Sequence, residues 1–176
     1  GFVGRINRDK GVNELFVAFR KLSEFYNNIK LILLGNAENT ENMDKDLFDW
    51  AQKSPNVIFI NYTNVVEQYL SAMDVYILPS YREGFGMGVV EAEAMGVPVI
   101  VSDIPGPIDA MLEKKTGVIV PKEDAVSLKK AMEELLLNKE TCLLYGQNGI
   151  EHAKNNFNQK HFLKEVLKNR KELFGE

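Results

Sequence analysis

The sequence predicts an α/β fold, a doubly wound parallel sheet of about six strands with helices on both faces. Short β-branched or aliphatic runs alternate along the chain with longer segments of helical period. The strand-like runs are apolar throughout, which is typical of strands buried from both sides. The 176 residues are 45% hydrophobic, which suffices for a full core, and no linker or repeat divides them. We therefore expect residues 1–176 to form one domain.

The predicted elements follow one another in a regular order. The strands are Phe2–Arg5, Lys30–Leu34, Val57–Ile60, Val75–Leu78, Val99–Val101 and Val118–Val120. The first helix carries an apolar stripe at three- and four-residue steps. The stripe consists of Val12, Leu15, Phe16, Phe19, Leu22 and Tyr26. Further helices are predicted at Met43–Lys53, from near Met87 to Gly96, and then at Ala125–Leu137, Glu140–Ala153 and Gln159–Phe174.

Composition excludes several classes of protein. The net charge is −4 with both signs interspersed, so the chain lacks the broad basic field of a nucleic-acid-binding protein. Its apolar runs are far shorter than the roughly twenty residues of a membrane-spanning helix. The lone Cys142 excludes an internal disulfide and agrees with a reducing compartment such as the cytoplasm. The chain begins inside a predicted strand without Met, so we expect it to be part of a longer protein.

The loop Gly4–Gly11, which follows the first predicted strand, is a candidate anion site. Ligands of open parallel sheets bind beyond the carboxyl ends of the strands. Here Arg5 and Lys10 meet the N-terminus of a helix, a combination suited to a diphosphate. The alternative is that both are ordinary solvated cations beside Arg8 and Asp9.

The segment Pro79–Ile100, after the fourth predicted strand, holds the second candidate site. Three glycines at 84, 86 and 88 allow close approach of the backbone to a ligand, and a helix begins near Met87. Glu83 precedes this helix and Glu91 lies just over a turn inside it. These carboxylates could contact different parts of one ligand. Alternatively, they are favourable acids at the start of an ordinary helix.

Together these motifs resemble the C-terminal domain of glycosyltransferase family 4. The resemblance rests on GRINRDKG, on Glu83 and Glu91 in EGFGMGVVE, on EAEAMGVPVI and on TGVIVPKED, in this order. It implies a Rossmann-like domain forming the C-terminal half of a GT-B glycosyltransferase, with the N-terminal acceptor domain missing from this chain. It also implies transfer from a nucleoside-diphosphate sugar with retention of anomeric configuration, in the synthesis of polysaccharide, lipopolysaccharide or glycolipid.

The resemblance also implies a role for each site residue. Arg5 and Lys10 would contact the donor diphosphate, Glu91 the ribose hydroxyls and Glu83 a sugar hydroxyl. The backbone amides of Phe85, Gly86 and Met87 would line the sugar, and those of Gly88 and Val89 would face the nearer phosphate. The whole enzyme is expected to be cytoplasmic, or peripheral on a membrane through the missing domain.

Two loops depart from the family pattern. Gly35-Asn36-Ala37 stands where the family usually has Gly-x-Gly near the nucleotide, so Ala37 puts a close approach at Gly35 in question. Asn61-Tyr62-Thr63 stands where main-chain groups usually hold the base. Tyr62 could stack on a base, although we expect it to be a partly buried loop residue.

No metal or other cofactor is expected. Asp44-Lys45-Asp46 matches a metal-binding Asp-x-Asp signature, but positions two apart on a helix point to different faces, and the acids suit a helix N-terminus. His152 and His161 are expected to be surface or packing residues. Alternative functions are another GT-B sugar-nucleotide enzyme of epimerase type and a non-catalytic nucleotide-sugar-binding module. A dehydrogenase is disfavoured because no G-x-G-x-x-G follows the first strand.

Overall fold

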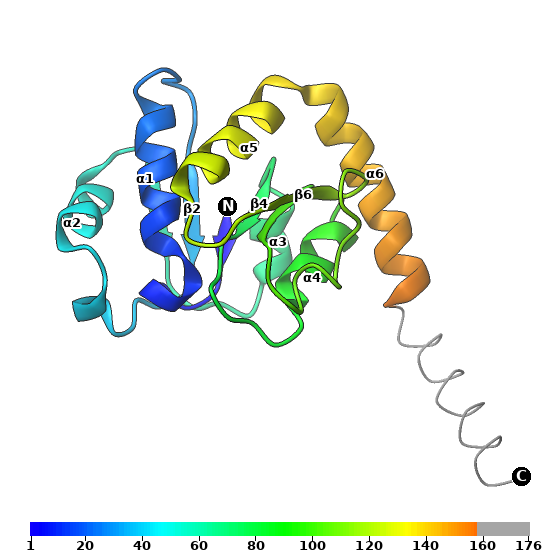
Figure 1. Ribbon diagram of the computed structural model, residues 1–176, viewed down its shortest axis with the longest axis horizontal. Helices are drawn as coiled ribbons and strands as arrows, with labels where there is room; N and C mark the ends of the chain where they lie inside the picture. The colour runs from blue at the N-terminus through cyan, green and yellow to red at the C-terminus, as the bar shows by residue number, and fades with distance from the viewer. Residues whose placement is uncertain (158–176) are drawn as a thin grey trace, which may run out of the picture.

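The computed structural model describes residues 1–157, in which strands and helices alternate as predicted (Figure 1). The strands are β1 (Phe2–Val3), β2 (Leu31–Leu34), β3 (Val57–Ile60), β4 (Tyr76–Leu78), β5 (Val99–Ser102) and β6 (Gly117–Val120). The α-helices are α1 (Val12–Ser23), α2 (Lys45–Lys53), α3 (Val66–Leu70), α4 (Met87–Ala94), α5 (Ala125–Leu137) and α6 (Lys139–Asn156). The 3-10 helices are η1 (Arg8–Lys10) and η2 (Thr40–Asn42). The predicted helix Gln159–Phe174 lies outside the described residues.

The strands form two parallel sheets, in the orders β1-β2-β3 and β4-β5-β6. Two hydrogen bonds join the sheets where β1 meets β4. The Gly1 nitrogen donates to the Val75 carbonyl at 2.6 Å, and the Ile77 N–H donates to the Gly1 carbonyl at 2.8 Å. The spatial order is therefore β3-β2-β1-β4-β5-β6, and the direction of winding reverses between β1 and β4. β1 ends at Val3, and Gly4 after it takes φ +149°, a backbone conformation that favours glycine.

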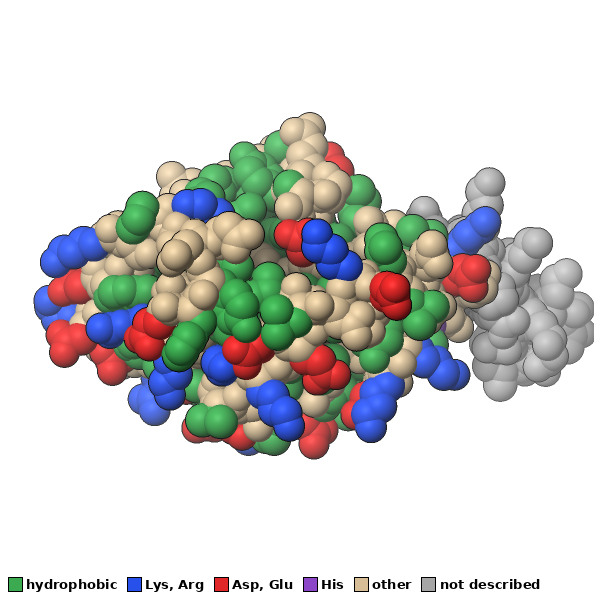
Figure 2. Space-filling view, turned by 90° about the horizontal axis from the view of Figure 1, so that it is seen from above, with side chains coloured by type: hydrophobic (Ala, Val, Ile, Leu, Met, Phe, Trp, Pro, Cys, Tyr) green, Lys and Arg blue, Asp and Glu red, His purple; other side chains and the backbone are tan. Residues whose placement is uncertain are grey.

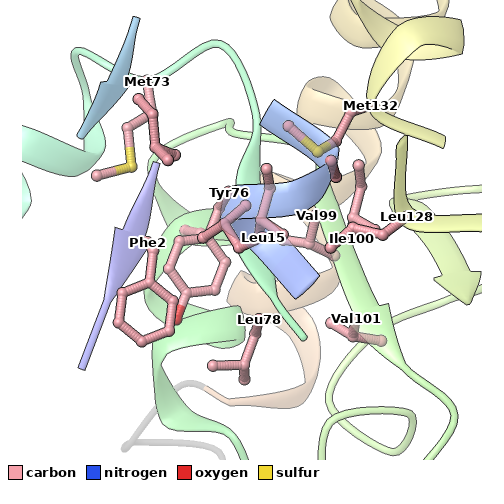
Figure 3. Packing of buried hydrophobic residues seen from close by; sticks show 14 of the residues in the cluster. Phe2, Leu15, Met73, Tyr76, Leu78, Val99, Ile100, Val101, Leu128 and Met132 are labelled. Carbon is pink, nitrogen blue, oxygen red and sulfur yellow. The ribbon is translucent and has the colours of Figure 1, made fainter. Parts of the chain in front are cut away.

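The core lies between this layer of strands and two groups of helices. One group runs from α2 through α1 to α5, and the other from α3 through α4 to α6 (Figure 1). Figure 3 shows Phe2 of β1, Leu15 of α1 and Tyr76 of β4 in the same packed region. The stripe predicted on the first helix is buried, except that Tyr26 is half-buried. The prediction that every strand is buried from both sides was wrong for β3. Its Ile58 is 39% exposed, because β3 forms the edge of its sheet.

Local hydrogen bonds decide several boundaries that periodicity alone placed differently. Helix α2 begins at Lys45 rather than Met43, because the Asp44 side chain accepts from the Leu47 N–H and caps the helix. Asp46 lies in the first turn, so both acids lie at the helix N-terminus, as the sequence indicated. Helix α3 and both 3-10 helices were not predicted, because segments of three to five residues are too short to show a helical period.

The start of α4 packs directly onto the sheet. The Tyr76 ring is buried, and its hydroxyl lies against Gly88 so closely that a Cβ at position 88 would overlap the oxygen. The hydroxyl has only a long contact, 3.5 Å, to the Val3 carbonyl. Burial raises the pKa of Tyr76, and the nearby Glu83 and Glu91 carboxylates act in the same direction. Gly88 is therefore needed by the packing of α4 on β4, independently of any ligand.

We predict that Gly88→Ala destabilises the protein in a way that depends on Tyr76. Ala normally stabilises a helix interior by about 1 kcal/mol relative to Gly, but overpacking costs roughly 1–3 kcal/mol. In a Tyr76→Phe background the overlapped oxygen is gone, so Gly88→Ala should be neutral or stabilising. A urea-unfolding double-mutant cycle should give a coupling of about 0.5–3 kcal/mol. Equal effects of Gly88→Ala in both backgrounds would contradict this packing, and Gly84→Ala, with no atom near its Cβ, is the control.

Candidate functional site

The loops that follow β1 and β4 lie against each other at the carboxyl ends of the strands. Gly11 lies against the Pro79 carbonyl so closely that a Cβ at position 11 would overlap it. The Tyr81 N–H donates to the Asp9 carbonyl at 2.8 Å, and the Arg82 guanidinium donates to the Asp9 carboxylate at 2.6 Å. The two candidate sites in the sequence are therefore two walls of one site.

Lys10 and Glu83 join these walls directly. The Lys10 Nζ lies 2.5 Å from the Glu83 Oε1, and the two side chains are only 16% and 14% exposed. The buried Ser80 hydroxyl donates to the same Glu83 oxygen at 2.9 Å. A cation and a carboxylate that are 73 residues apart in sequence are therefore held in contact, at the edge of solvent.

Arg5 lies in the same loop as Lys10 but in a different setting. Its side chain is 63% exposed, and its Nη1 lies 3.7 Å from the Glu38 Oε2 in the loop that follows β2. An exposed pair at that distance contributes little to stability. Arg5 can therefore reorient, whereas Lys10 is already engaged.

The N-terminus of α4 opens beside Glu83. Gly86 forms the N-cap with φ +83°, and no side chain caps the helix, so the first amides lack a side-chain partner. Phe85 and Met87 are 40% and 57% exposed, whereas Gly88 is half-buried and Val89 is buried in the core. Backbone N–H groups at this position, together with the positive end of the helix dipole, favour an anion.

The two carboxylates of α4 lie on opposite faces of the helix. Glu91 is exposed, and within residues 1–157 its carboxylate makes no hydrogen bond or ion pair. Glu93 is completely buried and is hydrogen-bonded to His152, which is a packing residue as expected. Burial raises the pKa of Glu93, against the effects of the neighbouring Thr116 and His152. The sequence analysis did not single out Glu93, although an acid in an otherwise small and apolar helix stretch was a visible signal.

The loops after β2 and β3 complete one side of the site. The Tyr62 N–H donates to the Asn36 side chain at 3.2 Å, which joins the two loops. The Tyr62 side chain is 73% exposed, so the expected partial burial was wrong: its loop lies outside the core at the edge strand. Ala37 pairs with Ile6 in an isolated bridge. Gly35 has φ +138°, and a Cβ there would overlap the Gly4 carbonyl, so chain packing requires this glycine.

The loop after β5 forms a support that the sequence analysis missed. Gly106 lies against the Gly84 carbonyl with φ +95°, and a Cβ at Gly86 would come within 3.2 Å of the Pro107 Cα. The loop after β5 therefore packs against the backbone of Gly84–Gly86. The Pro105-Gly106-Pro107 turn was the available signal. Gly84 differs from the other two glycines of this stretch, because nothing lies within 4 Å of its Cβ position.

On the face seen in Figure 2, charged side chains of both signs lie close to one another. Figure 2 shows acidic and basic side chains interspersed with hydrophobic ones over one face. Residues 1–157 bring together no group of three or more His, Cys, Asp or Glu side chains that could hold a metal ion. Among their helices, none combines the length and hydrophobicity needed to cross a bilayer.

Residues 1–152 match the sequence profile of the family described as glycosyl transferases group 1. The capsular polysaccharide biosynthesis glycosyltransferase CapM of Staphylococcus aureus is 32% identical over 166 residues, which is 94% of this chain and 44% of CapM. The D-inositol 3-phosphate glycosyltransferase of Corynebacterium efficiens is 30% identical over 88% of this chain and 38% of its own length. The chain therefore spans less than half of these relatives.

Solved structures share the fold. Sucrose-phosphate synthase from Thermosynechococcus elongatus matches with a TM-score of 0.83 and 27% identity, over 99% of this chain and 45% of that one. Anabaena HepE in complex with UDP matches with a TM-score of 0.87 and 19% identity, over 98% of this chain and 48% of that one. The fold is that of the C-terminal domain of GT-B glycosyltransferases. On the profile match and the relatives together, the chain belongs to the group 1 glycosyl transferase family.

Proposed function

We propose that residues 1–176 are the donor-binding domain of a retaining glycosyltransferase, which transfers a glycosyl group from a nucleoside-diphosphate sugar to an acceptor. The observation that carries the proposal is the contact of Lys10 with Glu83 beside the uncapped N-terminus of α4. A cation and free amides suit a diphosphate, and a carboxylate suits a sugar hydroxyl. The chain covers less than half of the length of these relatives, and we propose that the acceptor binds to a part of the protein outside residues 1–176.

The site residues are proposed to share the ligand among them, although the Val89 N–H already donates to the Gly86 carbonyl at 2.8 Å. Arg5 and Lys10 would bind the diphosphate, and Glu83 a hydroxyl of the sugar. Glu91, exposed on α4, would accept hydrogen bonds from the two ribose hydroxyls. The remaining contacts would come from the amides of Phe85, Gly86 and Met87 to the sugar, the amides of Gly88 and Val89 to the nearer phosphate, and Gly35 and Tyr62 near the nucleoside.

Because Lys10 and Glu83 are in contact, the donor has to separate them before each can bind its own part of the ligand. A diphosphate competes with Glu83 for the Lys10 ammonium, and moving that cation toward the phosphates frees the carboxylate. The freed Glu83 then has an acceptor oxygen available for a hydroxyl of the sugar. The Lys10–Glu83 pair therefore converts into two separate ligand contacts when the donor binds.

The chemical step is loss of a nucleoside diphosphate from the sugar carbon. Negative charge grows on the leaving oxygens as that bond breaks, and preorganised cations and amides facing them lower the barrier. We assign this role to Arg5, Lys10 and the start of α4, and no metal or cofactor is required by it. For retention, we propose that the leaving phosphate itself guides the attack of the acceptor.

The relatives suggest a biological setting. The name of CapM places it in capsular polysaccharide biosynthesis. A mannosyltransferase of Rhizobium leguminosarum that is 25% identical to this chain is named for lipopolysaccharide core biosynthesis. HepE was solved with UDP, with UDP and glucose and with UDP-glucose. We propose synthesis of a polysaccharide, lipopolysaccharide or glycolipid, in the cytoplasm or at the surface of a membrane. A sugar-nucleotide epimerase or a non-catalytic binding module would share the donor site, and detection of transfer by the whole protein separates them.

The chain by itself should bind a nucleoside-diphosphate sugar, with unchanged affinity in EDTA, because side chains and amides offset the phosphate charge. Ligand-detected NMR against UDP-, GDP- and ADP-sugars measures this without an acceptor. Loss of binding on chelation would return attention to acidic side chains, beginning with Asp44 and Asp46. Binding of none of the three would refute the proposed function.

Glu91→Gln should weaken binding of nucleoside diphosphate and nucleoside-diphosphate sugar alike, whereas Glu83→Gln should weaken only the latter. Hydrogen bonds to a charged group contribute about 1.5–3 kcal/mol, which corresponds to roughly 10- to 100-fold in affinity. Bare nucleotide should bind Glu83→Gln at least as well as wild type, because Lys10 no longer has to leave a carboxylate. Titration calorimetry measures both ligands, with exposed Glu67→Gln on α3 as the control. Equal losses for both ligands in Glu83→Gln would show that the two roles are wrongly divided.

Arg5→Ala should reduce affinity for the nucleoside diphosphate, and Arg5→Lys should restore only part of it, since an ammonium cannot make the two-pronged contact of a guanidinium. The matched control is Arg8→Ala, an exposed cation of the same loop. Both substitutions change the net charge equally, so a specific contact predicts a larger loss at Arg5. Equal losses of affinity at the two positions would show that Arg5 contributes only its positive charge and makes no specific contact with the diphosphate.

A further inference from the structure

The buried pair Glu93–His152 has no role in the proposed chemistry. It lies on the face of α4 opposite to Glu91. The Glu93 side chain is 0% exposed, and its Oε2 lies 2.6 Å from the His152 Nδ1. Within the described residues, its Oε1 has no hydrogen-bond partner. Burying a carboxylate is costly unless it is paired, and His152, together with the neighbouring Thr116, offsets that cost for Glu93.

Helix α6 lies along α4 because glycines allow close approach. A Cβ at Gly146 would overlap the Gly96 carbonyl just beyond the end of α4, and one at Gly149 would lie 3.3 Å from the Glu93 Cα. One turn further along α6, His152 meets Glu93, the penultimate residue of α4. The contacts thus advance from the C-terminal end of α4 toward its N-terminus as α6 proceeds. Figure 1 shows α6 passing beside α4.

An aromatic chain continues from His152 to the donor loop. The His152 ring packs edge-to-face on Phe157, with centroids 5.4 Å apart and an interplanar angle of 89°. Phe157 in turn packs on Phe85, with centroids 5.6 Å apart and an angle of 64°. Phe85 lies between Gly84 and Gly86, in the loop that precedes α4. Its position is therefore determined on one side by Phe157, the first residue after α6.

We propose that His152 is a positioning residue for the loop Gly84–Gly86. Its hydrogen bond to Glu93 fixes the imidazole, and the fixed ring holds Phe157 against Phe85, so that the amides of the loop face the donor. His152 contacts no ligand itself. The consequence for donor binding rests on the proposed function, whereas the effect on the loop does not.

The reason for an aromatic relay at this point is the conformational freedom of the loop. Gly84 has no neighbour within 4 Å of its Cβ position, and Phe85 is 40% exposed, so few contacts restrain the loop on its outer side. On its other side, the loop packs against the loop that follows β5. Phe157 supplies a second restraint, and His152 with Glu93 anchors that restraint to the rigid part of the domain.

The test compares His152→Gln and Phe157→Leu with wild type in the 176-residue chain. Gln retains a group that can donate to Glu93 but lacks the ring edge, and Leu removes the ring that reaches Phe85. Both variants should shift the backbone amide signals of Gly84, Phe85 and Gly86 in assigned ¹H–¹⁵N spectra of the free protein. Both should also lower affinity for the nucleoside-diphosphate sugar by roughly tenfold, and affinity for bare nucleotide less, within the coupling expected of contacting residues.

The control is Asn148→Ala, which removes a different tether of α6, the 2.8 Å bond to the Lys115 carbonyl, and should leave the loop signals unchanged. The double variant Glu93→Met/His152→Phe replaces the buried pair by apolar groups and keeps a ring at position 152, so it should return the loop signals toward wild type. Folded variants of His152 and Phe157 with loop signals like those of Asn148→Ala would overturn the proposal. Absence of any nucleotide-sugar binding by wild type would refute the proposed function, and the amide shifts would still decide the role of His152.

Discussion

The meeting of β1 and β4 is the constraint on which the candidate site depends. The strand order runs outward from this junction on both sides, so the loops after β1 and β4 leave the layer next to each other. Two backbone hydrogen bonds of Gly1 hold the junction, and the close approach of Gly11 to Pro79 holds the loops above it. Lys10 and Glu83 meet only because the chain crosses from one half of the layer to the other at this point.

The loops that follow β3, β2, β1, β4 and β5 are linked in the same order as their strands. Tyr62 contacts Asn36, Glu38 contacts Arg5, Lys10 contacts Glu83, and Gly84 contacts Gly106. These links differ in strength. The Arg5–Glu38 pair is exposed and contributes little, whereas Lys10–Glu83 is largely shielded from water, and the glycine contacts are backbone against backbone. The exposed Arg5–Glu38 link is therefore the one that a ligand can displace most easily.

Helix α4 has two separate tasks on its two faces. Its outer face exposes Glu91, its N-terminus has no side-chain cap, and its inner face carries Glu93 toward α6. Gly88 serves the fold by leaving room for Tyr76, so a glycine-rich sequence at a ligand site need not owe every glycine to the ligand. Only Gly84, with open space around its Cβ position, is free of such a packing requirement within the part of the chain described.

The sequence by itself determined the α/β class, the strands of the buried layer and the loops that hold the site, because hydrophobic periodicity and glycine-rich turns are local properties. The resemblance carried by Arg5, Lys10, Glu83 and Glu91 also determined the family. The tertiary structure decided what depends on contacts between distant residues. It paired Lys10 with Glu83, exposed Tyr62, separated Glu91 from Glu93 and brought His152 to a carboxylate 59 residues away. These outcomes follow from how the helices and strands pack, and no local pattern of residue types contains that information.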